Sequence, residues 1–275
     1  MFPERLENDT EQIYFSEDEY FCGNFNYIHT YLHTNYKYKM HAHQFYEINI
    51  VASGKGRHYI EDTSLDAEMG DVFVIPPGVS HGYYSEGELD IYHVLIKKDF
   101  LARYAEELAE IEGFEILFNI EPEIRRSSGK ALNLNVGSPD FVSFKAELER
   151  MKNIEASGRF VYLNALTIVF ICRLCRRICG SISESCEKEI VGVMEYIRNN
   201  LDRKLSLSEL SSRAHMSTAT LNRRFRSSVG MSPIEYILSC RVARAKELIS
   251  ESNIRRTDIA QICGFYDVAH MNKYL

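Results

Sequence analysis

Residues 205–225 read LSLSELSSRAHMSTATLNRRF and contain two short helical patterns separated by a tight turn. Leu210 and Ala214 lie on one face of the first predicted helix, and Leu221 and Phe225, four positions apart, mark the buried face of the second. Small residues where the helices cross allow a close approach. This arrangement is typical of a helix-turn-helix unit.

The same pattern recurs about 50 residues later, with one extra residue in the turn. The repeat aligns Ile259, Cys263 and Met271 with Leu210, Ala214 and Leu221. A longer helix is predicted between the copies, over Pro233–Ser250. One such pattern is weak evidence, because an unrelated helical core can imitate it. Two copies in tandem, joined by a helix, are much more specific.

The chemistry of the first unit suits a phosphate surface. No acidic residue lies between Glu209 and Glu235, whereas four arginines do. Asn222 and Arg223 lie on the outer face of the second helix, and such side chains make two-pronged contacts with adenine and guanine edges. The charge of the whole chain is −7, yet residues 187–275 hold 14 Lys and Arg against 10 Asp and Glu. A basic end on an acidic chain favours nucleic acid as a partner, although an excess of four charges is modest.

Residues 187–275 resemble the DNA-binding domain of the AraC/XylS family of bacterial transcription regulators, through LSELSSRAHMSTATLNRRFRSSVGMSPIEYI, RVARAKELI and IAQICGFYDVAHMNKYL. The resemblance implies seven helices and two recognition helices in successive major grooves of promoter DNA. By position, it implies that the base-reading residues are Ala219, Asn222, Arg223, Val268, Ala269, Asn272 and Lys273. It implies that the DNA backbone is contacted by Ser217, Thr218, Arg224, Arg226 and His270.

The family usually continues for about 15–20 residues beyond the second recognition helix, whereas this sequence ends at Leu275. We therefore expect the last helix of the DNA-binding domain to be missing. We also expect the 275-residue chain to bind DNA more weakly than a longer version would.

A second group of residues suggests a ligand site. His41, His43 and Glu47 fall on one face of an extended strand, because alternate side chains point the same way. His81 follows a Pro-Pro-Gly turn. Three imidazoles and one carboxylate form a reasonable ligand set for Zn, Fe, Mn or Ni.

These segments resemble the two cupin motifs, His-x-His, three residues, Glu, six residues, Gly, and then Gly, five residues, Pro-x-Gly, two residues, His. Asn35 and Ser85 stand where the motifs usually have Gly and Asn. The resemblance covers about 25–100 and implies a jelly-roll barrel, which is also the usual sensor domain of the regulator family. Three interpretations stay open: a metal site, a pocket that contacts an effector without metal, and hydrogen-bonded structural histidines.

The predicted fold class is α+β: an N-terminal cupin-like β-barrel with flanking helices, then an all-α domain of two helix-turn-helix units joined by a linker helix. The expected domains are 1–180 for sensing and dimerisation, 181–186 as a linker, and 187–275 for DNA binding. Strands are expected from 20 to about 136, including separate strands at Phe45–Val51 and Arg57–Ile60 with a turn between them. His58, His93 and His215 are interpreted as isolated structural residues. The aromatic run Tyr27–Tyr38 can line a pocket, because tyrosine offers both a ring face and a hydroxyl, but barrel wall is the favoured interpretation.

Composition excludes several classes. The apolar share of 45% and charged share of 26% are typical of a globular protein, and no apolar run approaches the roughly 18 residues of a membrane span. The acidic start lacks a secretion signal, and seven scattered cysteines fit a reducing cytoplasm.

The function that we predict is a non-enzymatic, sequence-specific transcriptional regulator, controlled by a small effector such as a sugar. Its expected partners are promoter DNA, RNA polymerase and a second copy of the chain, with no membrane. The alternatives are a metal-dependent cupin enzyme, an isomerase or dioxygenase, with a helical tail, and an inert dimerisation module.

Overall fold

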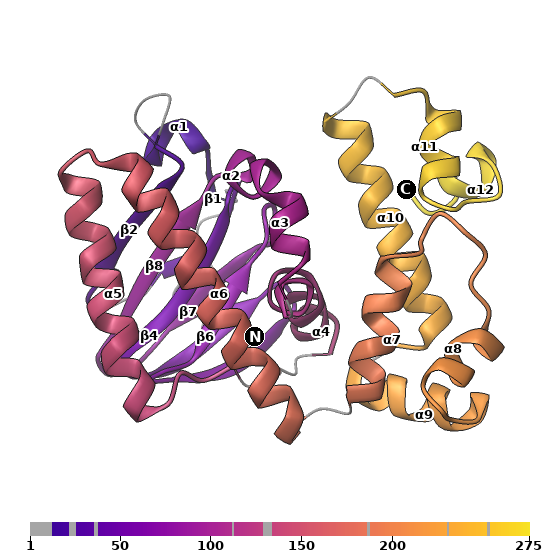
Figure 1. Ribbon diagram of the computed structural model, residues 1–275, viewed down its shortest axis with the longest axis horizontal. Coiled ribbons are helices and arrows are strands. Elements are labelled where there is room, and N and C mark those ends of the chain that lie inside the picture. The colour runs from indigo at the N-terminus through magenta and orange to yellow at the C-terminus, as the bar shows by residue number, and fades with distance from the viewer. Residues whose placement is uncertain are drawn as a thin grey trace. The chain divides into compact units, whose positions relative to one another are not determined.

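The computed structural model describes residues 13–21, 26–35, 38–111, 113–128, 134–185, 188–229, 231–251 and 254–275. The chain divides into two compact units, Met1–Ser185 and Cys186–Leu275. The first unit combines strands with helices and the second is helical, which confirms the predicted α+β class (Figure 1).

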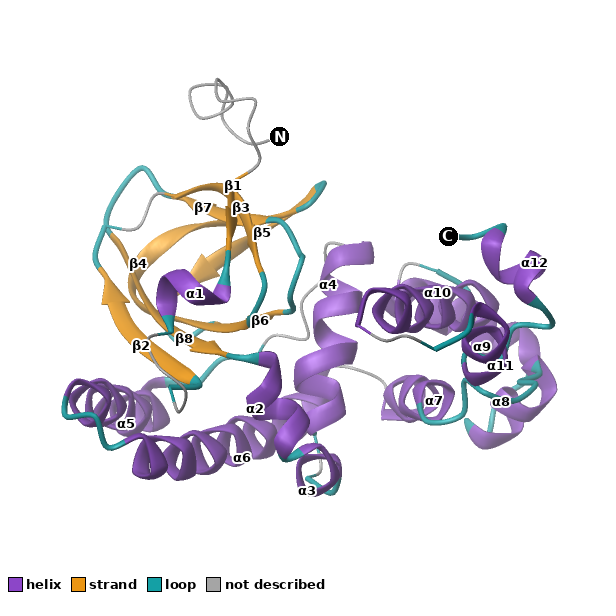
Figure 2. Ribbon diagram, turned by 90° about the horizontal axis from the view of Figure 1, so that it is seen from above, coloured by secondary structure: helices purple, strands orange, loops and turns teal. Residues whose placement is uncertain are grey.

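A curled sheet forms the centre of the first unit (Figure 2). Its strands are β1 (Ile13–Phe15), β2 (Ile28–His33), β3 (Tyr38–His43), β4 (Tyr46–Ile60), β5 (Thr63–Glu68), β6 (Val72–Ile75), β7 (His81–Tyr84) and β8 (Leu89–Ile96). Hydrogen bonds join them in the order β1-β3-β7-β4-β8-β2, and β5 and β6 also pair with β4.

Strand β4 corrects one prediction. The two strands expected at Phe45–Val51 and Arg57–Ile60 are a single 15-residue strand. The expected turn is a bulge, where the register with β8 shifts between Val51 and Ser53 and Gly54 adopts a φ of 81°. A bulge bends a strand without ending it. The first part of β4 therefore pairs with β6 and β8, and its last part pairs with β5 and β7, which curls the sheet.

The inside of the curled sheet is apolar toward one end. Its core cluster consists of Val51, Ala67, Phe73, Ile75, Tyr83, Leu89 and Ile91. Polar side chains occupy another part of the interior and are described below. Burial of this apolar surface is the main force that holds the barrel together.

Helices follow the last strand. They are α2 (Lys98–Arg103), α3 (Ala105–Ala109), η2 (Ile116–Ile120), α4 (Glu121–Ser128), α5 (Ser138–Ala156) and α6 (Phe160–Ser185), and α1 (Glu17–Tyr20) precedes β2. The prediction of strands up to about 136 was therefore wrong after Ile96. The run ILFNI at 116–120 is short and apolar, and periodicity cannot distinguish a buried strand from a buried helix in such a run.

Helix α6 extends into the stretch that was predicted as a linker. It continues to Ser185 and so includes residues 181–185, while Cys186 lies outside the described residues. Glycine and serine are weak helix formers, but the intrinsic cost is small once a long helix has already been nucleated. Polar composition alone therefore did not end this helix.

The second unit contains two helix-turn-helix pairs on either side of a long helix, as the sequence predicted. Its helices are α7 (Lys188–Arg198), α8 (Leu207–Arg213), α9 (Thr218–Val229), α10 (Pro233–Glu251), α11 (Arg256–Ile262) and α12 (Val268–Asn272). Leu210, Leu221 and Phe225 are fully buried in the first pair, and Ile259 and Met271 in the second. No helix in the described parts of either unit is both long enough and apolar enough for a membrane span.

Candidate effector pocket and nucleic-acid interface

Glu47 is the centre of a buried polar cluster inside the barrel. It lies on β4, and its carboxylate is within hydrogen-bond distance of three imidazoles from three other strand positions. His43 Nε2 and His81 Nε2 lie 3.1 and 3.0 Å from Oε2, and His93 Nδ1 lies 2.5 Å from Oε1. All four residues are at most 3% exposed.

Burial and hydrogen bonding act in opposite directions on Glu47. Burial raises the pKa of a carboxyl group because it disfavours the charged form. The hydrogen bonds with His43, His81 and His93 outweigh burial and hold the pKa of Glu47 well below its ordinary value. The cluster therefore contains a buried carboxylate, whose charge needs a compensating proton or cation nearby.

Backbone carbonyls fix the imidazoles of His41 and His43. His41 Nδ1 donates to the Lys39 carbonyl at 2.9 Å, and His43 Nδ1 donates to the Phe45 carbonyl at 2.7 Å. In the neutral rings Nε2 then carries a lone pair, which is the usual arrangement of a metal-ligating histidine. Burial, with the neighbouring His81, lowers the pKa of His41 to about 3, so this ring is neutral.

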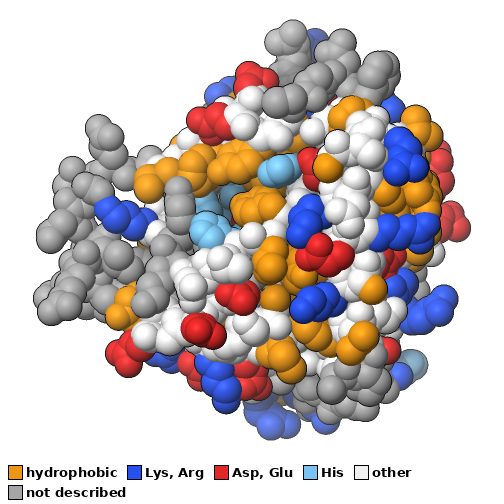
Figure 3. Space-filling view, turned by 90° about the vertical axis from the view of Figure 1, so that its left-hand side faces the viewer, with side chains coloured by type: hydrophobic (Ala, Val, Ile, Leu, Met, Phe, Trp, Pro, Cys, Tyr) orange, Lys and Arg blue, Asp and Glu red, His pale blue; other side chains and the backbone are white. Residues whose placement is uncertain are grey.

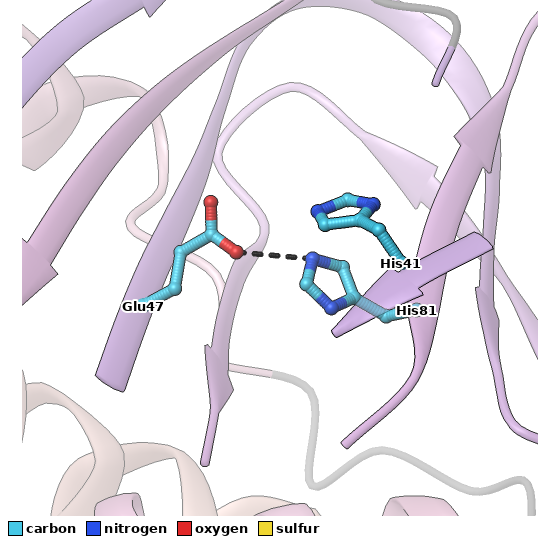
Figure 4. Close-up of side chains that lie close together, drawn as sticks. All are labelled: His41, Glu47 and His81. Atoms are coloured by element: carbon cyan, nitrogen blue, oxygen red, sulfur yellow. Dashed lines mark ion pairs between the residues drawn. The ribbon is translucent and has the colours of Figure 1, made fainter. Parts of the chain in front are cut away.

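The cluster fits a divalent metal ion. His41, Glu47 and His81 each offer one ligand atom, and these atoms lie within 4.8 Å of one another (Figure 4). His43 Nε2 lies 3.1 Å from Glu47 Oε2, at the same end of the cluster as these three ligand atoms. A shared proton or a bound cation can each bridge an imidazole nitrogen and a carboxylate at this distance.

A cavity of about 210 Å³ opens beside the cluster, and Figure 3 shows it as a hollow with histidine side chains at its wall. It is lined by Phe15, Tyr20, His29, Tyr31, His33, His41, His43, Phe45, Glu47 and Leu95. Aromatic rings thus face a polar end that carries Glu47. The lining contains no Lys or Arg side chain among the described residues.

One residue of the cluster was missed from the sequence. His93 contacts Glu47 directly, although it was interpreted as an isolated structural residue. Tyr31 belongs to the aromatic run for which barrel wall was favoured over pocket lining, and it lines the cavity and stacks on His93 with ring centroids 4.7 Å apart. His93 reaches Glu47 because β8 pairs with β4, which places His93 opposite Asn49. A local sequence pattern does not reveal which strands pair, so the sequence did not indicate this contact. His58 lies beside the cluster, with its ring centroid 5.8 Å from that of His81, and it stacks on Tyr83 at 4.2 Å.

The two helix-turn-helix units have the same turn. In the first, the amide of Ala214 bonds to the Leu210 carbonyl at 3.0 Å, and that of Met216 to the Ser211 carbonyl at 2.9 Å. In the second, the same bonds run from Cys263 to Ile259 at 2.9 Å and from Phe265 to Ala260 at 2.8 Å. This pattern ends a helix with one residue in the left-handed region. The repeat inferred from the sequence is thus a repeat of backbone geometry.

Side chains cap the N-termini of α9 and α12, the second helices of the two helix-turn-helix units. Ser217 Oγ accepts from the Thr220 amide at 3.1 Å at the start of α9, and Asp267 Oδ1 accepts from the His270 amide at 2.7 Å at the start of α12. Each cap satisfies a backbone donor that the helix itself leaves free. Ser217, expected to contact the DNA backbone, therefore also has this structural role.

The structure brings most of the expected DNA-contacting side chains to exposed positions. The exposed ones are Ser217, Thr218, Ala219, Arg223, Arg226, Ala269, Asn272 and Lys273. Asn222, Arg224, Val268 and His270 are half-buried. Val268 packs against the core of the second unit, so less of its side chain is available for a base than expected.

Besides Ser217, several of the exposed or half-buried polar groups have partners within the protein. Arg226 Nη2 lies 3.1 Å from Glu235 Oε2, and Arg224 Nη1 lies 3.9 Å from Met216 Sδ. Asn272 Oδ1 accepts from Arg256 at 3.2 Å. The absence of acidic residues between Glu209 and Glu235 in the sequence therefore did not leave Arg226 without a counter-charge.

Two family models match the chain. The AraC-like ligand binding domain matches residues 27–135, and a helix-turn-helix domain matches residues 210–275. A ligand-binding barrel joined to a helix-turn-helix domain defines a DNA-binding regulator with an effector-binding domain. The chain belongs to the AraC family of transcriptional regulators.

Curated relatives agree with this class. The "Uncharacterized HTH-type transcriptional regulator YfiF" of Bacillus subtilis is 24% identical over 84% of this chain and 73% of its own length. The "HTH-type transcriptional activator RhaR" of Enterobacter sp. is 24% identical over 82% and 79%. Because the relatives are regulators, the alternative of a cupin enzyme is not favoured.

Solved structures include ToxT of Vibrio cholerae, 13% identical over 90% of this chain and 92% of that one, with a TM-score of 0.38. The DNA-binding domain of AdpA in complex with a target DNA is 28% identical over 31% of this chain and 78% of that one, with a TM-score of 0.31.

Proposed function

We propose that this regulator reads promoter DNA with both helix-turn-helix units and is controlled by a small molecule in the cavity of the barrel. The observation that carries the proposal is the duplicated turn, which supports two outward helices, α9 and α12, built alike. On α9 the proposed base-reading residues are Ala219, Asn222 and Arg223, and on α12 they are Val268, Ala269, Asn272 and Lys273.

The proposed contacts to the DNA backbone come from short polar and basic side chains around the same helices: Ser217, Thr218, Arg224, Arg226 and His270. Contacts of this kind fix the orientation of a protein on the duplex, whereas base contacts supply sequence information. The direct test is selection of bound sequences from random double-stranded DNA with the full chain. We expect one enriched sequence with two half-sites, and failure to enrich any sequence contradicts the proposal.

We also propose that the effector is a small polar molecule with an apolar face, and a sugar fits this description. Tyr20, Tyr31 and Phe45 offer aromatic faces, while His29 and His33 offer hydrogen-bonding groups at the same cavity. An effector changes DNA binding only if it binds one arrangement of the protein better than another. Adding sugars singly to the DNA-binding assay tests this class, and we expect one of them to shift the affinity.

The metal interpretation follows from the donor set. His41, Glu47 and His81 would hold a divalent cation such as Zn, Fe, Mn or Ni, and His43 would complete the set. A bound cation would supply positive charge beside the cavity and a position for an effector oxygen. The histidines position the carboxylate, and all of them are buried.

Metal analysis of the gently purified chain, together with its melting temperature before and after chelation, tests the site. We expect about one metal ion per chain and a lower melting temperature after chelation, restored by adding the metal back. His41→Ala should abolish the metal content. His33→Ala is the matched control, because His33 lines the cavity outside the cluster. A metal-free protein with an unchanged melting temperature would support effector contact without metal.

We further propose that two copies associate through α6. This helix carries no charged side chain from 160 to 172, and Val161 and Val169, eight positions apart on one face, are 86% and 50% exposed. Val161→Glu is expected to shift sedimentation from dimer to monomer, and Arg159→Glu, at the exposed start of the helix, is the control. RNA polymerase is the proposed further partner and the cytoplasm the proposed compartment, because the relatives act in transcription.

A further inference from the structure

Asn222 and Asn272 occupy corresponding positions in the two helix-turn-helix units, yet their surroundings differ. Both lie on the helix that follows the turn. The residue that starts the preceding helix is Leu207 in the first unit and Arg256 in the second. These two positions also correspond, since Leu210 and Ile259 are aligned core residues.

Arg256 fixes the orientation of the Asn272 amide. Its Nη1 lies 3.2 Å from Asn272 Oδ1, and both side chains are exposed. A guanidinium group can only donate hydrogen bonds, so the amide must face it with the oxygen. Arg256 thereby occupies one of the two acceptor positions of the Asn272 oxygen and holds this oxygen on its own side, whereas the NH₂ group, which can only donate, stays available to an outside partner.

This orientation determines which base Asn272 can read. In the two-pronged contact with adenine, the asparagine amide donates a hydrogen bond to N7 and accepts one from the N6 amino group. Guanine presents two acceptors, N7 and O6, at the same edge. Resting on the proposed DNA-reading role of α12, we propose that Arg256 is a specificity-determining residue that makes Asn272 select guanine over adenine.

The first unit lacks an arginine that could orient its asparagine in this way. Leu207 has no donor, and Asn222 makes no side-chain hydrogen bond within the described parts of the chain. Its amide keeps both a donor and an acceptor, as contact with adenine requires. The two units therefore present the same side-chain amide to DNA with different hydrogen-bonding capacity. We accordingly expect the two half-sites of the bound DNA to differ in sequence, although the two units have the same fold.

Arg255 provides a matched control. It neighbours Arg256, is also exposed and carries the same charge. Its guanidinium pairs with Asp258, with Nε 2.9 Å from Oδ2, and not with Asn272. Arg255→Ala therefore removes one positive charge from the same region without freeing the Asn272 oxygen.

The experiment selects bound sequences from random double-stranded DNA with the full chain, then measures affinities for the four single-base variants at each position. Arg256→Leu, which copies the first unit, should move the guanine-to-adenine affinity ratio at one position toward adenine by about fivefold or more, the lower limit for a two-pronged base contact. Arg256→Glu accepts from the amide nitrogen and turns the oxygen outward, so it should move the ratio in the same direction. Arg255→Ala should lower both affinities alike.

Asn272→Ala identifies the position concerned, because its base preference should disappear there. An unchanged ratio in both Arg256 variants at that position would overturn the inference and leave the proposed function intact. So would an Asn272→Ala variant that alters no position. If the wild-type chain enriches no sequence, the proposed function fails, and the inference fails with it.

Discussion

In the first helix-turn-helix unit His215 occupies the left-handed position of the turn, with a φ of 51°, and in the second unit Gly264 does so, with a φ of 72°. The backbone geometry is the same, but the space around it differs. A Cβ atom at Gly264 would overlap the carbonyl oxygen of Leu201 and approach Arg241 Nη2 at 2.8 Å. The first turn is open enough for a histidine, whose exposed side chain meets no such obstacle.

The reading helices differ more than the turns. Helix α9 has 12 residues and carries Asn222, Arg223 and further arginines, whereas α12 has five residues and begins with the apolar Val268 and Ala269. A repeated backbone thus supports two surfaces with different chemistry. The comparison teaches that the turn determines where the second helix of each unit lies, whereas the side chains that this helix presents are not preserved by the repeat.

The largest effect is expected at the turns. Gly264→Ala should destabilise the second unit by roughly 3 kcal/mol or more, because it combines left-handed strain with overlap on the Leu201 carbonyl. His215→Gly should change the stability of the first unit by no more than about 1 kcal/mol. Hydrogen exchange of the amides in α8, α9, α11 and α12 measures both. Equal effects in the two units would contradict the difference in space around His215 and Gly264.

The next effect concerns DNA affinity. Arg223→Ala should weaken binding by about 1–3 kcal/mol and remove discrimination at one base, because arginine makes a two-pronged contact with guanine. Lys273→Ala, at the corresponding position of α12, should cost less, since lysine acts as a point charge. Titrations with the selected DNA and its single-base variants compare the two. A larger loss for Lys273→Ala would assign the main base contacts to the second unit instead.

Arg226 should contribute only to affinity. Its exposed ion pair with Glu235 is weak, so DNA phosphate can replace the carboxylate. Arg226→Ala is expected to lower affinity equally for all sequences and to reduce the slope of log K against log salt by about 1. Arg244→Ala, an exposed arginine on α10 outside both reading helices, is the control. A changed base preference in Arg226→Ala would show that this residue reads sequence.

The sequence predicted the two units well because their signals are local. The apolar spacing of Leu210, Leu221 and Phe225, and the caps at Ser217 and Asp267, are each set within a few residues. The capping pair of α10 is equally local, with Ser232 and Glu235 bonded in both directions. Local backbone chemistry can be recognised from spacing alone.

The barrel was predicted less completely because its contacts are long-range. The His41, His43, Glu47 and His81 set could be found from motif spacing, and the structure places all four together. His93 joins them only through the pairing of β8 with β4, a contact across 46 residues. Likewise, Gly54 looked like a turn, and only the strand pairing reveals it as a bulge.

The smallest effect tests how the first helix of each unit begins. Ser206 Oγ accepts from the Glu209 amide at 3.2 Å at the start of α8, whereas Arg255 begins α11 without a side-chain cap. The return bond from Glu209 to the Ser206 amide is not made, because the Glu209 carboxylate bonds to Tyr196 at 2.6 Å and to Arg203 instead.

Ser206→Ala should therefore cost about 1 kcal/mol of stability through the lost cap alone. Arg255→Ser should gain roughly 0.5 kcal/mol in the second unit, because a serine can accept from the Asp258 amide and the exposed pair with Asp258 that it replaces is worth little. Hydrogen exchange in α8 and α11 detects both changes. If Arg255→Ser destabilised α11, the uncapped start would be a requirement of that helix, and the two units would differ in backbone chemistry as well as in surface.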